Sequence, residues 1–295
     1  MQRKDRIDGF GAGALLAVML LLAFNQVIVK VVNEGLQPVF FAGLRSALAV
    51  PFVGGWLWLR GQPPRLTRAT AGAGVLIGTV FAAEFLCLFL ALDLTTVSRA
   101  SIIFYSMPVW MALMAHFGLA GERLTRLRVV GLALAFTGTV VAILDQSGAA
   151  TGQASLAGDM FALGGAVGWA GTAFIARRPV MAAVGPQMQL FWMVLVSAPI
   201  LLLAAPLFGP LIRDLQPVHL FWLVFQAGVV VTGGFMSWLW LLSIYPAATV
   251  ASFSFLTPIF GLTLGWLLLN EPVSAQVLVA AALVAVGIIL INRRG

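Results

Sequence analysis

Two charged residues, Glu84 and Arg45, lie deep inside long apolar runs of the sequence. Glu84 stands about 8 residues from one end of its run and Arg45 about 7 from the matching end of its own, or roughly 10 to 12 Å along a helix. A buried carboxylate can hold an ammonium group, and a guanidinium can hold a carboxylate. The two residues therefore predict either a site for a charged small molecule or a structural ion pair that lets both be buried.

Uncharged polar residues reach a similar depth in other runs, namely Asn25, Ser101 and Tyr105. If the helices that carry them are neighbours, these side chains form one polar cluster with Glu84 and Arg45. In that cluster Glu84 would bind an ammonium group, and Arg45 or Asn25 would bind a carboxylate. Without Arg45 as its partner, Glu84 could instead carry a proton, which makes proton coupling an alternative.

Large aromatic rings are concentrated in the second half of the chain. Trp169 and Trp238 lie deep in their runs and are candidates for a cavity wall, with packing between helices as the alternative. Ser252 and Thr257 are further polar candidates, although a hydroxyl in a helix commonly bonds back to its own backbone. Rings on one wall and a few charged groups on the other suit a ligand with an apolar side chain and a zwitterionic head.

The composition indicates what kind of structure must position these residues. Of 295 residues, 61% are hydrophobic and 9% are charged, against about a quarter charged in soluble domains, so a soluble globule is excluded. The net charge of +7 lies in short clusters between apolar runs, which predicts membrane orientation and not nucleic-acid binding. The sequence has no phosphate-binding loop, nucleophile elbow or metal-ligand motif, so we expect the protein to bind no cofactor and no metal and to have no enzymatic activity.

Apolar runs of about 18 residues or more can cross the hydrocarbon core of a membrane as helices. The sequence contains ten such runs, which predicts an all-α integral membrane protein with ten transmembrane helices. The first five are expected near Gly9–Val31, Pro38–Trp58, Thr70–Leu92, Thr96–Gly118 and Leu127–Leu144. The second five are expected near Leu156–Ala176, Gln187–Phe208, His219–Ile244, Ala247–Leu269 and Ala275–Ile291.

The Lys and Arg residues predict which helix ends face the cytosol. When the spans alternate in direction, thirteen of the 17 basic residues fall on the side of both chain termini. Only Lys30, Arg99 and Arg213 fall on the other side, and Arg45 lies inside a helix. By the positive-inside rule both termini are expected in the cytosol, and the expected location is a bacterial-type inner membrane that the chain crosses many times.

The two groups of five runs resemble each other in sequence. Four pairs of residues align: Pro108 with Pro258, Tyr105 with Phe255, Glu122 with Glu271, and Gly138 with Gly287. Because five is odd, the second copy enters the membrane from the opposite side, so we expect inverted repeats at 1–148 and 149–295. Such repeats are typical of secondary transporters, which open a midplane site to either side in turn. Chance alignment of apolar helices is the alternative.

Residues present in both repeats are expected to serve the scaffold. Pro108 and Pro258 lie near mid-helix, where a proline predicts a kink that shapes a cavity or a gate, with direct substrate contact as the alternative. Glu122 and Glu271 lie at the start of the last helix of each repeat, where we expect each carboxylate to cap the helix. The counterpart of Glu84 in the second repeat is Gly234, so the fold does not require a carboxylate there and Glu84 is the stronger functional candidate.

The ten helices, the two repeats and the Pro, Glu and Gly that end each repeat resemble the drug/metabolite transporter superfamily, EamA type, over essentially the whole chain. Two segments, FFAGLRSALAV in the second helix and GAVGWAGTAFIARR in the sixth, are similar to that family's R-x-x-x-A feature and its Trp followed by a distant basic residue. Within the family the sequence looks most like the YddG-type bacterial exporters of aromatic amino acids, although Leu22 stands where their first helix has a Trp.

This resemblance implies a secondary transporter that exports amino acids, aromatic or otherwise apolar, by alternating access, with protons as a candidate coupling ion. An exporter of drugs or other small metabolites with the same fold is the alternative. A passive channel is less favoured, because it would need a continuous polar lining and these helices carry isolated polar residues.

Overall fold

A computed structural model of the chain describes residues 7–118, 125–145, 152–245 and 253–292. Its first half contains α1 (Gly9–Gly35), α2 (Pro38–Leu59), α3 (Arg68–Leu94), α4 (Val97–Phe104), α5 (Met107–Gly118) and α6 (Arg126–Leu144). Its second half contains α8 (Leu156–Ala176), α9 (Pro179–Ala182), α10 (Pro186–Ala204), η1 (Ala205–Phe208), α11 (Pro217–Phe225), η2 (Gln226–Gly234), α12 (Phe235–Ile244), η3 (Phe253–Phe255), α14 (Leu256–Leu269) and α15 (Ala275–Asn292). The described residues form no β-strand, only an isolated bridge between Leu36 and Ile212.

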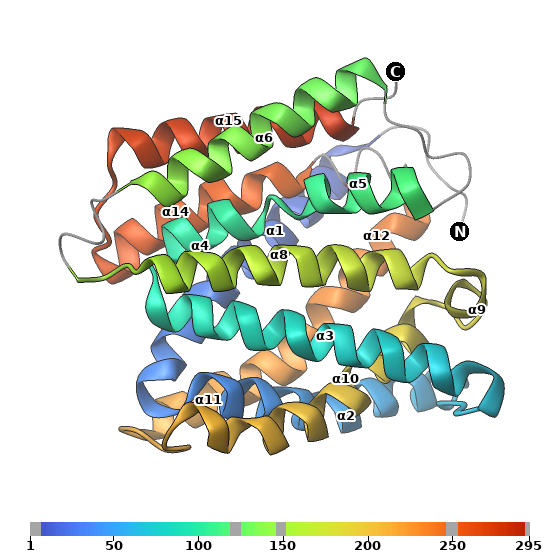
Figure 1. The fold of residues 1–295 in the computed structure, drawn as a ribbon. Helices are drawn as coiled ribbons and strands as arrows, with labels where there is room; N and C mark the ends of the chain where they lie inside the picture. The colour runs from blue at the N-terminus through green and yellow to red at the C-terminus, as the bar shows by residue number, and fades with distance from the viewer. Residues whose placement is uncertain (1–6, 119–124, 146–151, 246–252, 293–295) are drawn as a thin grey trace.

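The ten predicted spans are confirmed in number and order. Eight helical stretches are long and apolar enough to cross a membrane, and the two shorter apolar helices α14 and α15 complete the set. The stretch α11, η2 and α12 forms one span, as do α4 and α5 together. In Figure 1, α1 begins and α15 ends at the same end of the bundle, which an even number of spans requires. We call this the terminal end, and we call the opposite end, where α3 is followed by α4, the junction end.

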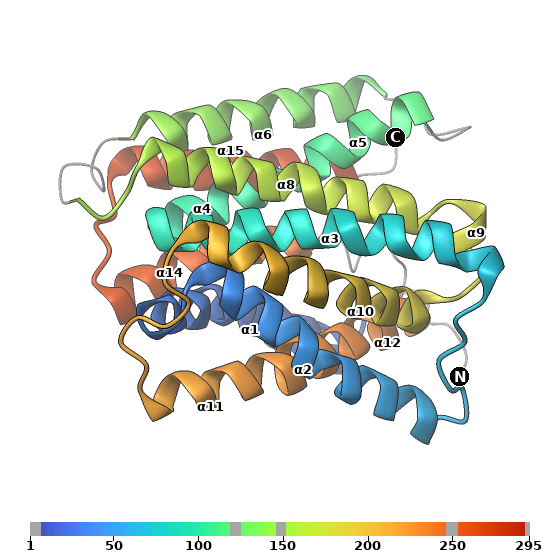
Figure 2. The same ribbon diagram turned by 60° about the horizontal axis from the view of Figure 1, so that its bottom comes forward.

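The last helices of the two halves pack on each other. The contact between α6 and α15 is the most extensive between any two elements of the described chain, and both views show the pair side by side at one edge of the bundle (Figures 1 and 2). A Cβ added at Gly138 would lie 2.8 Å from the Ala280 carbonyl oxygen, and one at Gly131 would lie 2.8 Å from that of Gly287. Glycine is therefore what allows the two backbones to approach so closely.

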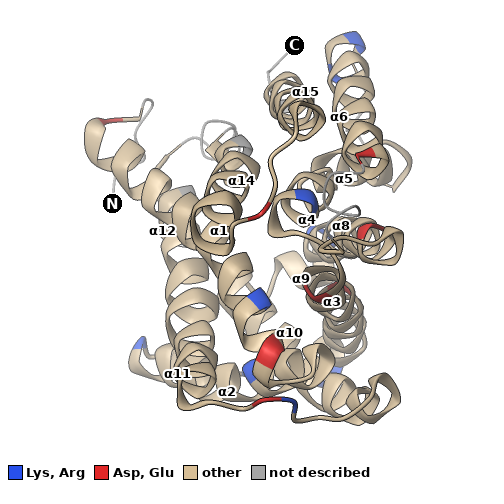
Figure 3. Ribbon diagram, turned by 90° about the vertical axis from the view of Figure 1, so that its left-hand side faces the viewer, with Lys and Arg blue, Asp and Glu red and all other residues tan. Residues whose placement is uncertain are grey.

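The helices that carry most of the candidate residues are central. In α1 and α3, 56% of the most apolar window is buried within the protein, against 28% in α6. Viewed from the junction end, the bundle shows a few isolated Lys, Arg, Asp and Glu positions among helices that are otherwise free of charge (Figure 3). Positions that are both charged and buried are therefore few, and each needs a physical explanation.

The predicted mid-helix positions of the two prolines, in the fourth and ninth spans, need a correction. The fourth span is interrupted at Tyr105 and Ser106, and Pro108 is the second residue of the new helix α5, not a mid-helix residue. Pro258 is likewise the third residue of α14, directly after the short 3₁₀ turn η3. A proline is tolerated in the first turn because the N–H that it lacks would have no partner there. In both halves the break in the helix thus precedes the proline.

The eighth span contains a feature that the sequence did not predict. Residues Gln226–Gly234 form a π-helix between α11 and α12. The Thr232 hydroxyl donates to the carbonyl of Ala227, five residues earlier, at 2.9 Å. Such segments are rare and are frequent at functional sites.

Candidate functional site

Arg45, on α2, lies against the aromatic face of α3. Its guanidinium carbon is 3.9 Å from the centroid of the Phe85 ring and 4.8 Å from that of Phe89, within range of cation–π attraction. The residue is 2% exposed, and no described protein atom accepts a hydrogen bond from its Nε or Nη2. Arg45 is thus a buried cation with two unused donors.

Glu84 precedes Phe85 on α3 but faces α8, because adjacent helical residues point about 100° apart. The Thr172 hydroxyl donates to Glu84 Oε2 at 3.0 Å. Helix α8 approaches closely here, since a Cβ added at Gly168 would lie 2.9 Å from the Cα and Cβ of Glu84. Among the ion pairs of the described residues, none joins Glu84 to Arg45 within 4.0 Å. Of the two predicted alternatives, the direct ion pair is the one this structure does not form.

Asn25 on α1 and Gln226 at the start of the π-helix contact each other. The Gln226 amide nitrogen donates to the backbone carbonyl of Asn25 at 3.2 Å. Both residues are buried, at 8% and 0% exposure, and the side-chain oxygens Asn25 Oδ1 and Gln226 Oε1 accept no hydrogen bond from the described chain. This contact therefore presents two buried acceptors that have no donor.

Two further candidates lie where α1, α4 and α14 meet. The Ser101 hydroxyl donates to Gln26 Oε1 at 2.6 Å. At the end of α4, the side chain of Tyr105 interacts with the Thr257 hydroxyl, and that hydroxyl lies 3.2 Å from the sulfur of Met19. Thr257 therefore bonds across to other helices, and the expected bond to its own helix is not the one found. These contacts connect the first repeat to α14.

The aromatic candidates lie in separate parts of the core. Trp169 on α8 is half-buried against the largest hydrophobic cluster, whereas half-buried Trp238 packs against a cluster of α1 and α12. Ser252 lies outside the described residues. Trp192 on α10 packs its ring over Gly74 of α3, and its buried Nε1 has no acceptor in the described chain.

The polar candidates near mid-bundle form what we call the polar layer: Asn25, Gln26, Arg45, Glu84, Ser101 and Gln226. Hydrogen bonds and ring contacts connect neighbouring helices within it, but they form separate groups and not the single cluster predicted. Gln26 and Gln226 were not among the predicted site residues, although each is an amide inside an apolar run. In the part of the chain described here, no three His, Cys, Asp or Glu side chains gather as a metal site would need.

The junction end holds a second polar group, which we call the junction network: Arg99, Asp145, Asp159, Thr95 and Ser274. Arg99 on α4 donates to both carboxylate oxygens of Asp159 on α8 and to the carbonyls of Ile143 and Asp145. Its Nη1 lies 3.5 Å from Asp145 Oδ2. Thr95 and Ser274 donate to Asp159 and Asp145 at 3.0 and 2.7 Å. The sequence predicted Arg99 only as a marker of orientation.

Glu271 acts as a cap, but not for the helix that was predicted. It accepts from the backbone N–H of Val97 and Ser98 at 2.6 and 2.9 Å, and from the Ser98 hydroxyl at 2.8 Å. The carboxylate therefore caps α4 in the first half instead of α15, because the end of α14 places it beside the free N–H groups of α4. Its predicted counterpart, Glu122, lies outside the described residues.

Two basic residues complete the junction end. Lys30 of α1 donates to the carbonyls of Leu92 and Thr95 at 3.2 and 2.6 Å, so a cation lies at the C-terminal end of α3, where the helix dipole favours it. Arg213, in the loop before α11, pairs with Asp93 through bonds of 2.7 and 2.9 Å. Hydrogen bonding to Asp93 raises the pKa of Arg213 above its ordinary value.

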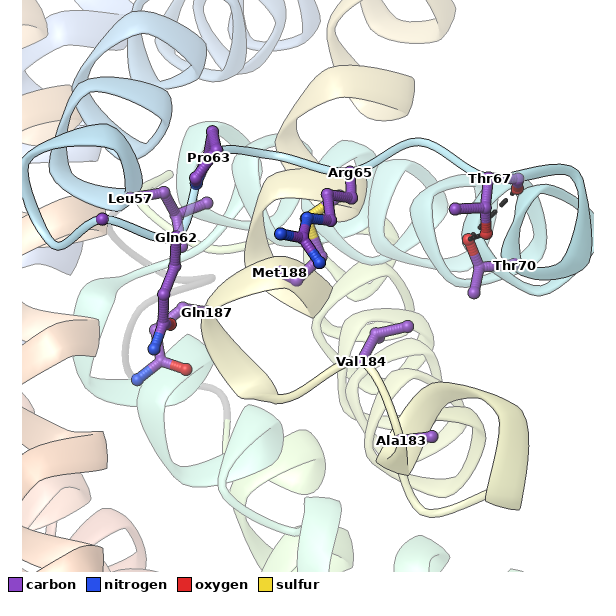
Figure 4. A pocket seen from close by; sticks show the side chains of 11 residues that line it. Leu57, Gln62, Pro63, Arg65, Thr67, Thr70, Ala183, Val184, Gln187 and Met188 are labelled. Atoms are coloured by element: carbon purple, nitrogen blue, oxygen red, sulfur yellow. Dashed lines mark hydrogen bonds between the residues drawn. The ribbon is translucent and has the colours of Figure 1, made fainter.

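A surface pocket of about 460 Å³ lies at the terminal end between the α2–α3 loop and the start of α10. Gln62, Arg65, Thr67 and Met188 are among its lining residues, and the Thr67 and Thr70 hydroxyls lie 2.9 Å apart at its rim (Figure 4). None of the predicted site residues lines this pocket. It is therefore distinct from the polar layer.

An apolar bundle of ten spans that encloses a few buried polar groups defines a class, the multi-pass membrane proteins. The EamA-like transporter family matches residues 9–144 and, a second time, residues 156–293. The chain belongs to this family.

Two relatives match over most of their length. The protein named "Probable amino-acid metabolite efflux pump" of Escherichia coli (strain K12) is 28% identical over an alignment of 302 positions, which covers 98% of this chain and 94% of that protein. The "Uncharacterized transporter YvbV" of Bacillus subtilis (strain 168) is 28% identical over 294 residues, covering 95% and 92%. A solved crystal structure superposes with a TM-score of 0.64 at 22% identity and covers 95% of this chain and 96% of its own, a likeness that shows the fold.

Proposed function

We propose that this transporter exports amino acids with aromatic or other apolar side chains by alternating access. The observation that carries the proposal is the polar layer. A bundle made of apolar helices keeps Arg45, Asn25 and Gln226 buried with polar atoms that no described protein group satisfies. Buried polar groups are costly unless they are hydrogen-bonded, and inside a membrane they mark substrate pathways.

The amino-acid assignment rests on the relatives together with this chemistry. Two relatives, from Escherichia coli and Salmonella typhimurium, carry the name "Probable amino-acid metabolite efflux pump". A cation and free amide oxygens complement the carboxylate and ammonium of an amino acid. The rings of Trp169 and Trp238 are proposed walls for its side chain. Export of drugs or other small metabolites is the alternative that the same fold allows.

We infer that alternating access is built on inverted repeats at 1–148 and 149–295. The support is the α6–α15 contact, where Gly138 and Gly287, an aligned pair of the repeat, both lie at close backbone approaches. The helix breaks before Pro108 and Pro258 are proposed as the points at which the two halves change shape. Repeat-related breaks would let each half adopt the conformation of the other in turn.

The proposed setting is a bacterial inner membrane with both termini in the cytosol, so that the junction end faces outward. Protons are the candidate coupling ion, with Glu84 as their carrier. Its carboxylate is buried and accepts a hydrogen bond from the neutral hydroxyl of Thr172, so Glu84 is a membrane-embedded acid suited to change its charge during the cycle.

The test is transport by the purified chain in proteoliposomes loaded with labelled phenylalanine, tryptophan, threonine or a sugar nucleotide. We expect counterflow of the aromatic amino acids, accelerated by unlabelled substrate on the opposite side, and none of the sugar nucleotide. Protein-free liposomes are the control. Absence of any amino-acid flux would contradict the proposal. Flux without acceleration from the opposite side would favour a channel.

A further inference from the structure

The geometry points to Arg45 as a bidentate receptor for the carboxylate of the transported molecule, which makes a free carboxylate a requirement for recognition. This inference rests on the proposed function and deepens it, because it names the part of the substrate that the protein reads. It differs from the sequence prediction, in which either Arg45 or Asn25 could take the carboxylate.

The first argument is the position of the free hydrogen-bond donors on the Arg45 guanidinium. Arg45 Nε and Nη2 are fully buried, and no described protein atom accepts a hydrogen bond from either. These nitrogens lie on one edge of the guanidinium, and their N–H bonds point in parallel. A carboxylate presents two oxygens at the matching spacing, so this edge forms the paired, charge-assisted contact that arginine makes with carboxylates.

The second argument is the surroundings of the guanidinium. Phe85 and Phe89 contact Arg45 with their rings and leave its hydrogen-bonding edge unused. The rings also hold the group in place, so little side-chain freedom is lost when an anion binds. A structural arginine in the same protein, Arg99, instead donates to the carboxylate of Asp159 and to two backbone carbonyls, and lies 3.5 Å from a second carboxylate, that of Asp145.

The third argument concerns the nearest internal anion, Glu84, whose charge attracts Arg45 from a distance but does not occupy its donors. Glu84 lies next to Phe85 in the sequence but on another side of α3, where it accepts from Thr172 and packs against Gly168. Among the described residues, none forms an ion pair with Arg45 within 4.0 Å. Because a buried charge without a hydrogen-bonded partner is destabilising, an external anion that binds the free donors stabilises Arg45.

The experiment begins with binding, so that it does not depend on transport. The full chain in detergent is heated with 3-phenylpropanoate, phenethylamine, L-phenylalanine, L-phenylalaninamide or inorganic phosphate. We expect the two carboxylates to raise the melting temperature and the amine, the amide and phosphate to leave it unchanged. Arg45→Gln and Arg45→Met should abolish the shift. Arg60→Gln is the matched control, because Arg60 is an exposed arginine whose guanidinium stacks on Trp56 at 4.8 Å.

Counterflow of labelled L-phenylalanine then separates affinity from turnover. In Arg45→Gln we expect KM to rise about tenfold or more with a smaller change in kcat, and Arg45→Lys to recover part of the affinity, because it restores the charge without the paired donors. If carboxylates stabilise the wild type through Arg45 but no amino acid is transported, this inference stands and the proposed function fails. If amino acids are transported and Arg45→Gln shows the same preference for L-phenylalanine over L-phenylalaninamide as the wild type, the inference is overturned. It is also overturned if phosphate is the only ligand that gives an Arg45-dependent shift in melting temperature.

Discussion

Arg99 and Arg45 are both buried arginines, at 4% and 2% exposure, yet their surroundings differ in kind. Arg99 donates to a carboxylate, Asp159, and to backbone carbonyls, and lies close to a second carboxylate, that of Asp145. Arg45 contacts two rings, and its Nε and Nη2 have no acceptor among the described residues. A saturated charge fixes one arrangement of helices, whereas an unsaturated one is suited to a ligand that binds and leaves. The comparison thus separates structure from function among residues of one type.

The largest expected effect is on folding, from Arg99→Gln. Removal of one partner of a buried ion pair leaves Asp159 uncompensated, which costs about 3–5 kcal/mol. We expect a lower melting temperature in detergent and less monodisperse protein, while Arg45→Gln should melt at or above the wild-type temperature. The double variant Arg99→Met with Asp159→Leu should recover much of the loss, because it removes both charges. If Arg45→Gln lowers the melting temperature more than Arg99→Gln does, the distinction between the two arginines is contradicted.

A smaller loss is expected from Glu271→Gln. The amide oxygen can still accept from Val97 or Ser98, but the negative charge at the start of α4 is lost, so we expect about 1–2 kcal/mol. The same melting assay measures it. Asp214→Asn, at an exposed acidic residue of the same end, is the control and should be close to neutral. A Glu271→Gln protein as stable as this control would show that the cap contributes nothing.

Glu84→Gln tests the role of a second buried charge of the polar layer. The amide oxygen keeps the bond from Thr172, so we expect stability within about 1 kcal/mol of the wild type. Transport should be impaired or should change its dependence on pH, because glutamine cannot carry a proton. Counterflow and gradient-driven uptake from pH 5 to 8 measure this. Rates that match the wild type at every pH would leave Glu84 with a structural role only.

The smallest effect is expected at the pair of Arg213 and Asp93, which also lies at the junction end but is partly exposed, at 37% and 18% of the two side chains. Such pairs contribute about 0–1 kcal/mol and are screened by salt. Arg213→Gln should therefore lower the melting temperature slightly at low ionic strength and not at high salt. A loss as large as that of Arg99→Gln would mean that burial does not distinguish these pairs.

The sequence was sufficient for the spans, because apolar length alone determines which segments can cross a membrane. The prediction of Pro38–Trp58, for example, ends one residue short of the observed α2, Pro38–Leu59. The π-helix that begins at Gln226 was missed, since its hydrogen-bond pattern leaves no mark in an apolar run. The break at Tyr105 was placed slightly too late, at Pro108, because proline was expected to act from within the helix.

The candidate site was predictable only as a set of residues at similar depth. Which of them meet depends on contacts between distant segments: Glu271 caps a helix whose first residue lies 174 positions earlier, and Gln226 bonds to Asn25 across 201 positions. The sequence also could not predict which neighbouring helix Glu84 contacts, because this depends on how α3 is rotated against α2 and α8. Charge and depth indicate a candidate, and helix rotation decides its partner.

The central claim is that the unused edge of Arg45 recognises a carboxylate. Its most direct measurement is the ratio of inhibition constants for L-phenylalanine and L-phenylalaninamide against labelled L-phenylalanine in counterflow, in the wild type and in Arg45→Gln. The account predicts a preference for the acid of about tenfold or more in the wild type, reduced toward one in the variant. An equal preference in both proteins would contradict it.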